Sequence, residues 1–214
     1  MINKKGKSLA RPILILILIL ESFALPTQFY LLLKSNEFAI LESILRFFSF
    51  FTILTNSIVA LCCGVILFMK TSQAYAFFHR NSTLTAITVY ILIVGLVYNI
   101  ILRPLQDLTG IHKLNTEIFH TVVPLLFLLY WYFFTQKENI HWKSILIWLI
   151  YPVLYMIYTL FHGLYTDFYP YPFINVTKIG FTKAMQNGMF VLVSFVVMSL
   201  ILIGIGKLRI KKYS

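Results

Sequence analysis

Two residues in apolar parts of this chain carry side chains that can perform hydrolytic chemistry together. Thr52 lies in the run Phe-Phe-Ser-Phe-Phe-Thr that follows Arg46, and His120 opens the run His-Thr-Val-Val-Pro. A threonine hydroxyl is a weak nucleophile unless a neighbouring base takes its proton, and histidine is suited to that task. The pair therefore predicts nucleophilic attack on a carbonyl carbon, and a hydrophobic ester is the electrophile that we expect.

Both residues also have a simpler interpretation as packing groups. Ser49, Thr52 and Asn56 are spaced by three and four, so a continuous helix places them on one face, where they can bond a neighbouring helix. A buried histidine can be neutral and satisfied by one carbonyl. Thr55 is a rival nucleophile, because it lies close to the same face as Thr52. The residue types alone leave these alternatives open.

The composition defines the class of protein that holds these residues. Of 214 residues, 59% are hydrophobic and 12% are charged, whereas soluble chains have about 25% charged residues. Such a chain is neither a soluble enzyme nor a disordered segment. Cys62 and Cys63 are adjacent, which excludes a disulfide scaffold. We expect a polytopic membrane protein.

Six apolar runs are long enough to cross a bilayer as helices. They are continuous and lack the alternation of barrel strands, and no loop between them is long enough to form a domain. We therefore expect a single all-α transmembrane domain over residues 1–214, a bundle of six transmembrane helices. The predicted helices are about 12–33, 45–69, 84–102, 116–134, 145–162 and 184–205.

The basic residues indicate an orientation. With six spans, 12 of the 18 Lys and Arg residues lie on the side of the two termini, which predicts that both termini are cytoplasmic. The net charge of +11 is thus an orientation signal, and we expect no nucleic-acid partner. The Lys-rich start before Ile13 resembles a signal peptide, but apolar residues continue to Leu33, so we expect an uncleaved first helix.

Counting along the helices predicts that the two reactive residues lie at the same depth in the membrane. Thr52 lies six residues beyond Arg46, or about 9 Å at the helical rise, and His120 lies seven residues beyond Lys113, or about 10 Å. Both helices enter from the non-cytoplasmic side in the predicted orientation. We therefore expect a site in the outer leaflet, facing the non-cytoplasmic side.

Further polar residues gather at that end of the predicted bundle. Asn56 or Asn99 is a candidate donor to an oxyanion, and Asp107 or Asp167 is a candidate to orient a histidine. Arg103 lies one turn beyond Asn99. His162 is an alternative base at the end of a tyrosine stripe, and the stiff segment 169–173 either caps the site or is a rigid loop. No metal, nucleotide or other cofactor motif is present, so we expect no cofactor and no metal.

Three short motifs resemble a known family of membrane proteins. They are the residues around Phe51-Thr52, His120-Thr-Val-Val-Pro124, and Tyr169-Pro-Tyr-Pro-Phe-Ile-Asn-Val176. They occur in the same order in the androgen-induced-gene-type integral membrane hydrolases. The pattern is most similar to the bacterial branch of that family, the Pr-six-Pr type of six-span proteins, over residues 45–206.

The resemblance implies an activity and two catalytic residues. Animal members of the family are threonine hydrolases that cleave fatty acid esters of hydroxy fatty acids with a threonine and a histidine. By motif position, Thr52 is the implied nucleophile and His120 the implied base. We thus expect a lipid esterase of the bacterial cytoplasmic membrane, whose partners are membrane lipids and an ester taken from the bilayer. The alternative is a non-enzymatic protein that binds or transports lipids or small molecules.

Overall fold

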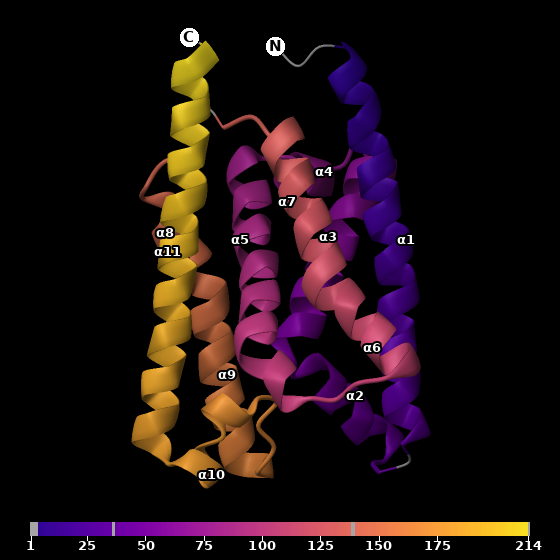
Figure 1. Ribbon diagram of the computed structural model, residues 1–214, viewed down its shortest axis with the longest axis vertical. Helices are drawn as coiled ribbons and strands as arrows, with labels where there is room; N and C mark the ends of the chain where they lie inside the picture. The colour runs from indigo at the N-terminus through magenta and orange to yellow at the C-terminus, as the bar shows by residue number, and fades with distance from the viewer. Residues whose placement is uncertain (1–3, 36, 138–139, 214) are drawn as a thin grey trace.

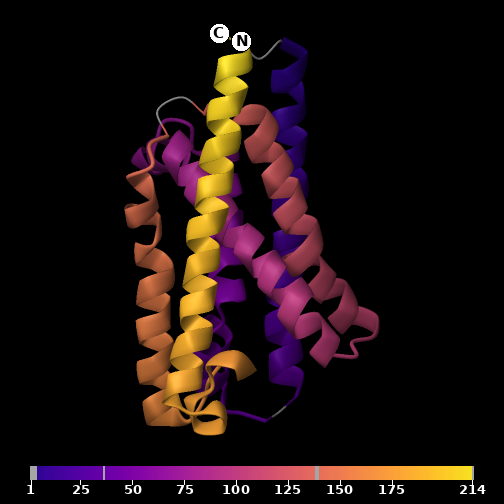
Figure 2. The ribbon, with the colours of Figure 1, turned by 60° about the vertical axis from the view of Figure 1, so that its left-hand side comes forward.

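The computed structural model is a bundle of long helices (Figures 1 and 2), and it describes residues 4–35, 37–137 and 140–213. No strand occurs within those ranges. Six helical segments are long and apolar enough to cross a membrane, which confirms the predicted six-helix, all-α class. These segments are Leu9–Lys34, Phe51–Phe68, Asn81–Leu105, Gly110–Phe134, Ser144–Thr166 and Phe181–Leu208.

The long elements alternate in direction along the bundle, and short elements join them. The long helices are α1 (Lys4–Lys34), α3 (Phe51–Phe68), α5 (Asn81–Val97), α7 (Val123–Phe134), α9 (Ile150–Thr166) and α11 (Phe181–Tyr213). The short α-helices are α2 (Ile40–Phe48), α4 (Gln73–Phe78), α6 (Gly110–Glu117), α8 (Ser144–Trp148) and α10 (Val176–Ile179). Two π-helical turns, η1 (Tyr98–Leu102) and η3 (Ile118–Val122), and two 3₁₀ turns, η2 (Arg103–Leu105) and η4 (Pro172–Ile174), complete the chain.

Helix α5 forms the centre of the bundle. In the most hydrophobic part of the span Asn81–Leu105, which begins with α5, 67% of the residues are buried, against 22% for the span Leu9–Lys34 within α1. It packs against α3, α7 and α11, while α1 lies on the outer side of α3 and α7. A helix that is apolar on all sides is stable only when other helices surround it or lipid does. Some polar groups of this interior are paired: Trp131 Nε1, for example, donates to Thr85 Oγ1 at 2.8 Å.

The two chain ends lie at the same end of the bundle, as the even number of spans requires (Figure 1). The connection containing α4 lies at that end, and α2, α6 and α10 lie at the opposite end. Helix α3 starts at this opposite end, and η3 lies toward it as well. The geometry therefore brings residues 52 and 120 to a similar depth, as expected.

The second predicted helix differs from the observed one. Residues 45–69 are not a continuous helix, because α2 ends at Phe48 and α3 begins at Phe51. Phe50 between them has an extended backbone with ψ of 125°. Ser49 thus lies in the turn after α2, whereas Thr52 lies in α3. The predicted common face of Ser49, Thr52 and Asn56 is therefore wrong at its first member.

Candidate active site

Thr52 occupies the second position of α3, where backbone N–H groups have no intrahelical acceptor. Phe50, which precedes the helix, offers no side-chain cap. Instead, the N–H of Phe51 donates to the hydroxyl of Tyr155 on α9, and the N–H of Thr52 donates to the hydroxyl of Tyr171, both at 3.2 Å. Two tyrosines that are distant in sequence therefore define where the helix begins, and this explains the break after Phe48.

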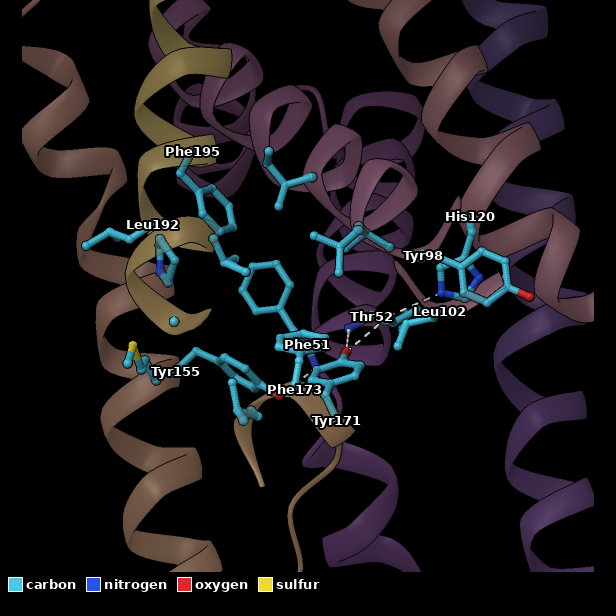
Figure 3. A pocket seen from close by; sticks show the side chains of 18 residues that line it. Phe51, Thr52, Tyr98, Leu102, His120, Tyr155, Tyr171, Phe173, Leu192 and Phe195 are labelled. Carbon is cyan, nitrogen blue, oxygen red and sulfur yellow. Dashed lines mark hydrogen bonds between the residues drawn. The ribbon is translucent and has the colours of Figure 1, made fainter. Parts of the chain in front are cut away.

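The side chains of Thr52 and His120 meet, as Figure 3 shows. Thr52 Oγ1 lies 3.4 Å from His120 Nε2, which confirms the predicted proximity. The other ring nitrogen, Nδ1, lies 2.9 Å from the carbonyl oxygen of Thr116. A carbonyl can only accept, so Nδ1 carries the hydrogen, and a neutral ring then has its lone pair on Nε2. The Thr52 hydroxyl donates to that lone pair, which is the arrangement of a nucleophile and its base.

One π-helical turn contains the histidine, and a second π-helical turn lies beside it. His120 lies within η3, and the ring of Tyr98, the first residue of η1, stacks on the imidazole at 4.0 Å between centroids. A π turn rotates the following residues around the helix axis, and such turns are frequent at functional sites. Helix α5 lies close to the backbone of His120. A Cβ added at Gly95 would lie only 2.8 Å from the carbonyl oxygen of His120. Stacking on Tyr98 thus holds the His120 ring, and close helix packing holds the His120 backbone.

A polar network behind the histidine joins the same two turns. Arg103 forms a two-pronged ion pair with Glu117, with Nη1–Oε1 and Nη2–Oε2 distances of 2.6 and 2.8 Å. Thr121 Oγ1 donates to the same carboxylate, and Arg103 Nε donates to Asn99 Oδ1. Asn99 Nδ2 donates in turn to the carbonyl oxygen of His120 at 3.0 Å. This network ties η1 to η3 and thereby positions His120.

Sequence reasoning missed Glu117. Its signal was present, because Glu117 and Thr121 are four residues apart within an apolar span, and an arginine near that depth requires a counter-ion. The structure brings the predicted residues Asn99 and Arg103 together with Glu117 in one network. Their contacts make them positioning residues for His120, since both donor and acceptor groups of Asn99 are already bonded within the network.

The reactive pair lies between two cavities. One has a volume of about 80 Å³ and is lined by apolar residues of α3, α5, α9 and α11 (Figure 3). The other has a volume of about 270 Å³ and adds the polar side chains of Gln28, Gln106 and Thr116. Both cavities are bordered by the same five residues, and these are Thr52, Tyr98, Leu102, His120 and Tyr171. A substrate bond next to Thr52 would thus have the apolar cavity on one side and the more polar cavity on the other.

The segment 169–173 lies against this site. Tyr171 Oη lies 3.2 Å from Thr52 Oγ1, and the Tyr171 ring stacks on Phe173 at 5.3 Å. Asn187 on α11 donates to the carbonyl oxygen of Phe173 and holds the segment in place. Burial raises the pKa of Tyr171, so its hydroxyl retains its proton. Because this hydroxyl accepts from the Thr52 N–H, its own proton is available to Thr52 Oγ1.

Thr55 and Asn56 have different surroundings from Thr52. Both are fully buried, and neither borders the two cavities beside Thr52. Thr55 Oγ1 lies 3.1 Å from the hydroxyl of Tyr151, and Asn56 Nδ2 donates to the carbonyl oxygen of Thr52. The geometry therefore favours Thr52 over Thr55 as nucleophile. Asn56 supports the backbone of Thr52, and its position does not fit the expected oxyanion donor.

The remaining predicted residues lie apart from the pair. His162 stacks on Tyr158 and lies 3.4 Å from Thr166 Oγ1, not from Thr52. Asp167, with a positive φ of 55°, ends α9 and accepts a hydrogen bond from Thr177. Asp107 is exposed in the turn before α6. Neither Asp107 nor Asp167 orients His120, because Nδ1 of His120 is already bonded to the carbonyl oxygen of Thr116.

Comparison of the chain with protein-family profiles, with curated proteins and with solved structures finds no match. Within the described ranges, no three His, Cys, Asp or Glu side chains lie close enough together to hold a metal ion. The interpretation of the site thus rests on its own geometry.

Proposed function

We propose that this chain is an intramembrane lipid esterase that uses Thr52 as nucleophile and His120 as base. The observation that carries the proposal is the 3.4 Å distance between Thr52 Oγ1 and His120 Nε2. Because Nδ1 donates its hydrogen to the carbonyl oxygen of Thr116, Nε2 of the neutral ring has no hydrogen and can accept the proton of Thr52. Catalytic hydrogen bonds are often long before substrate binds and shorten in the substrate complex. The motif resemblance to the androgen-induced-gene-type hydrolases supports the same two residues.

The reaction proceeds in two halves. Thr52 Oγ1 attacks the acyl carbon while its proton passes to His120 Nε2, and a tetrahedral oxyanion forms. The ester C–O bond then breaks, the leaving alcohol takes the proton from His120, and an acyl-threonine remains. Water, activated by the same imidazole, attacks the acyl-threonine and releases the fatty acid. Each half returns the histidine to its neutral form.

The oxyanion has two sources of stabilisation in this proposal. Thr52 lies in the first turn of the 18-residue helix α3, whose N-terminus carries partial positive charge. The hydroxyl of Tyr171 retains its proton and lies 3.2 Å from Thr52 Oγ1, within reach of an oxygen that forms beside it. Preorganised donors of this kind are often the largest contribution to rate in acyl transfer. We assign this role to Tyr171 in place of Asn56 and Asn99.

The substrate class follows from the surroundings of the pair. The cavity next to Thr52 is bordered almost entirely by apolar side chains, so it accepts an acyl chain better than a polar group. A fatty ester, such as a fatty acid ester of a hydroxy fatty acid, fits this lining and can enter from the bilayer. The same apolar cavity would serve the second candidate function, non-enzymatic binding or transport of a lipid.

We further propose the bacterial cytoplasmic membrane as location, with both termini cytoplasmic and the site toward the opposite face. The support is the charge distribution, because 12 of 18 basic residues lie on the side of the termini. Reporter fusions to the C-terminus, active on one side of the membrane only, test this orientation independently of the chemistry.

The two candidate functions are separated by hydrolysis assays on the purified protein in detergent. A panel of lipid esters, including fatty acid esters of hydroxy fatty acids, is compared for wild type, Thr52→Val and His120→Ala. We expect each variant to reduce turnover by roughly a thousandfold or more, as removal of a nucleophile or base does elsewhere. Thr55→Val is the matched control and should retain activity. Lipid binding without hydrolysis in the wild type would favour the binding protein.

A further inference from the structure

A third cavity lies at the other end of the bundle, where α1 starts and α11 ends (Figure 1). Its volume is about 970 Å³, and residues of α1, α3, α4, α5 and α7 line it. None of these residues borders the cavities beside Thr52. The proposed esterase chemistry gives this space no role.

The rim of this cavity is basic. Arg11, Lys70 and Arg80 line it together with His79, and among the residues that the structure describes no aspartate or glutamate does. The ion pairs of the described chain are Arg46–Glu42 and Arg103–Glu117, so these three cations have no carboxylate partner there. Positive charge at one membrane face is expected from orientation alone. That rule does not require the charges to converge on one cavity.

A buried hydroxyl gives an independent indication of a ligand. Thr135, just beyond the end of α7, lines the cavity and is only 5% exposed. Its Oγ1 has no hydrogen-bond partner. Buried hydroxyls normally have one, since leaving such a group unpaired costs roughly 1–3 kcal/mol. A bound acceptor, such as an anionic oxygen, would satisfy this hydroxyl.

The cavity also has an apolar lining, about one helical turn further into the bundle than the basic residues. Leu14 of α1, Leu67 of α3 and Leu84 of α5 line it with the aromatic ring of Phe134. An occupant that fits both regions has an anionic head and an apolar portion. Phosphate is the anion that Arg, Lys and hydroxyl donors recognise in concert, and it is the common headgroup charge of membrane amphiphiles.

We propose that this cavity binds the phosphate group of an amphiphilic ligand. Arg11, Lys70 and Arg80 hold the charge, the Thr135 hydroxyl donates to a phosphate oxygen, and the apolar floor takes the first part of the hydrocarbon. The phosphate can belong to an anionic phospholipid headgroup or to a free phosphate ester. This site is independent of Thr52 and of the proposed hydrolysis.

Native mass spectrometry of the full-length protein in detergent tests the proposal. The probes are phosphatidylglycerol, the zwitterionic phosphatidylcholine, and glycerol 3-phosphate. The variant Arg11→Gln/Lys70→Gln/Arg80→Gln removes three charges from the rim. Its matched control, Lys113→Gln/Lys178→Gln/Lys183→Gln, removes three charges at the opposite end, where none of these residues lines this cavity. Thr135→Val removes the hydroxyl without changing charge.

We expect phosphatidylglycerol to bind more tightly than phosphatidylcholine, with a Kd raised about tenfold or more in the rim variant and unchanged in the control. Thr135→Val should also raise the Kd, and Thr52→Val should not. If glycerol 3-phosphate binds as tightly as phosphatidylglycerol, the bound phosphate belongs to a free phosphate ester. If glycerol 3-phosphate does not bind, the phosphate belongs to a lipid headgroup. Equal weakening in the rim variant and the control, or no anion preference in the wild type, would overturn the proposal.

Discussion

The hydroxyl of Tyr171 lies 3.2 Å from both the backbone nitrogen and Oγ1 of Thr52. One phenol thus caps the start of α3 and contacts the side chain proposed as nucleophile. The cap comes from a segment that is 119 residues away in sequence, so the position of Thr52 depends on the loop before α11. Loop and nucleophile are structurally coupled.

Removing this phenol should slow hydrolysis while leaving the protein folded. Tyr171→Phe deletes a donor to the Thr52 oxygen and to the oxyanion, and we expect kcat to fall about 100-fold with a smaller change in KM. Steady-state hydrolysis of the best lipid ester measures both constants. Tyr165→Phe is the control, because Tyr165 is 86% exposed and should have no effect. An unchanged kcat for Tyr171→Phe would remove Tyr171 from the mechanism.

The ion pair behind His120 should affect turnover without touching the substrate. Glu117→Gln removes the carboxylate that pairs with Arg103, and so weakens the network that holds η1 and η3 together. We expect kcat to fall about tenfold or more with little change in KM, because misplacement of a catalytic group slows chemistry and not binding. Kinetic assays with a lipid ester give this separation.

The pair Arg46–Glu42 provides the control for that variant, because it is partly exposed like Arg103–Glu117. Its ions are four residues apart on α2, and such surface pairs contribute about 0.2–1 kcal/mol to stability. Glu42→Gln should therefore leave both kcat and KM near the wild-type values. A similar loss of kcat in both variants would mean that charge, and not the position of His120, controls the rate.

Gly95 should be intolerant of a side chain. Gly95→Ala would place a Cβ 2.8 Å from the carbonyl oxygen of His120, and helix backbones must separate to accept it. We expect a loss of roughly 1–3 kcal/mol in stability together with lower activity. Gly64→Ala is the matched control, since no side chain and no neighbouring helix lies within 4 Å of its added Cβ and alanine favours the helix. Thermal unfolding in detergent compares the two variants, and an equally stable Gly95→Ala would contradict the close packing.

Glu21 should be a destabilising residue. It is fully buried in α1, and neither carboxyl oxygen has a hydrogen-bond partner. Replacement by an apolar side chain of similar size, Glu21→Leu, removes that unpaired group and should stabilise the protein by roughly 1–3 kcal/mol. Thermal unfolding in detergent measures the change, with the exposed Glu37→Leu as control. A lower melting temperature for Glu21→Leu would show that the carboxyl is satisfied in the folded protein.

The parts of the fold that depend on composition and regular geometry could be predicted from the sequence. Six apolar runs imply six spans, and the constant rise of a helix brings Thr52 and His120 to one depth. The start of α3 could not be predicted, because its cap comes from Tyr155 and Tyr171 in distant segments. Glu117 was missed for a related reason. Its importance lies in its pairing with Arg103, which directly follows the π turn η1, while Glu117 directly precedes the π turn η3. Periodicity does not reveal such turns.

The central claim is that Thr52 attacks the ester with His120 as base, and trapping the nucleophile tests it most directly. The purified protein is treated with a fluorophosphonate probe, digested, and analysed by peptide mass spectrometry. We expect an adduct on Thr52 that is lost in Thr52→Val and strongly reduced in His120→Ala, while Thr55→Val is labelled like wild type. An adduct on Thr55 or another residue, or labelling of Thr52 that persists in His120→Ala, would contradict it.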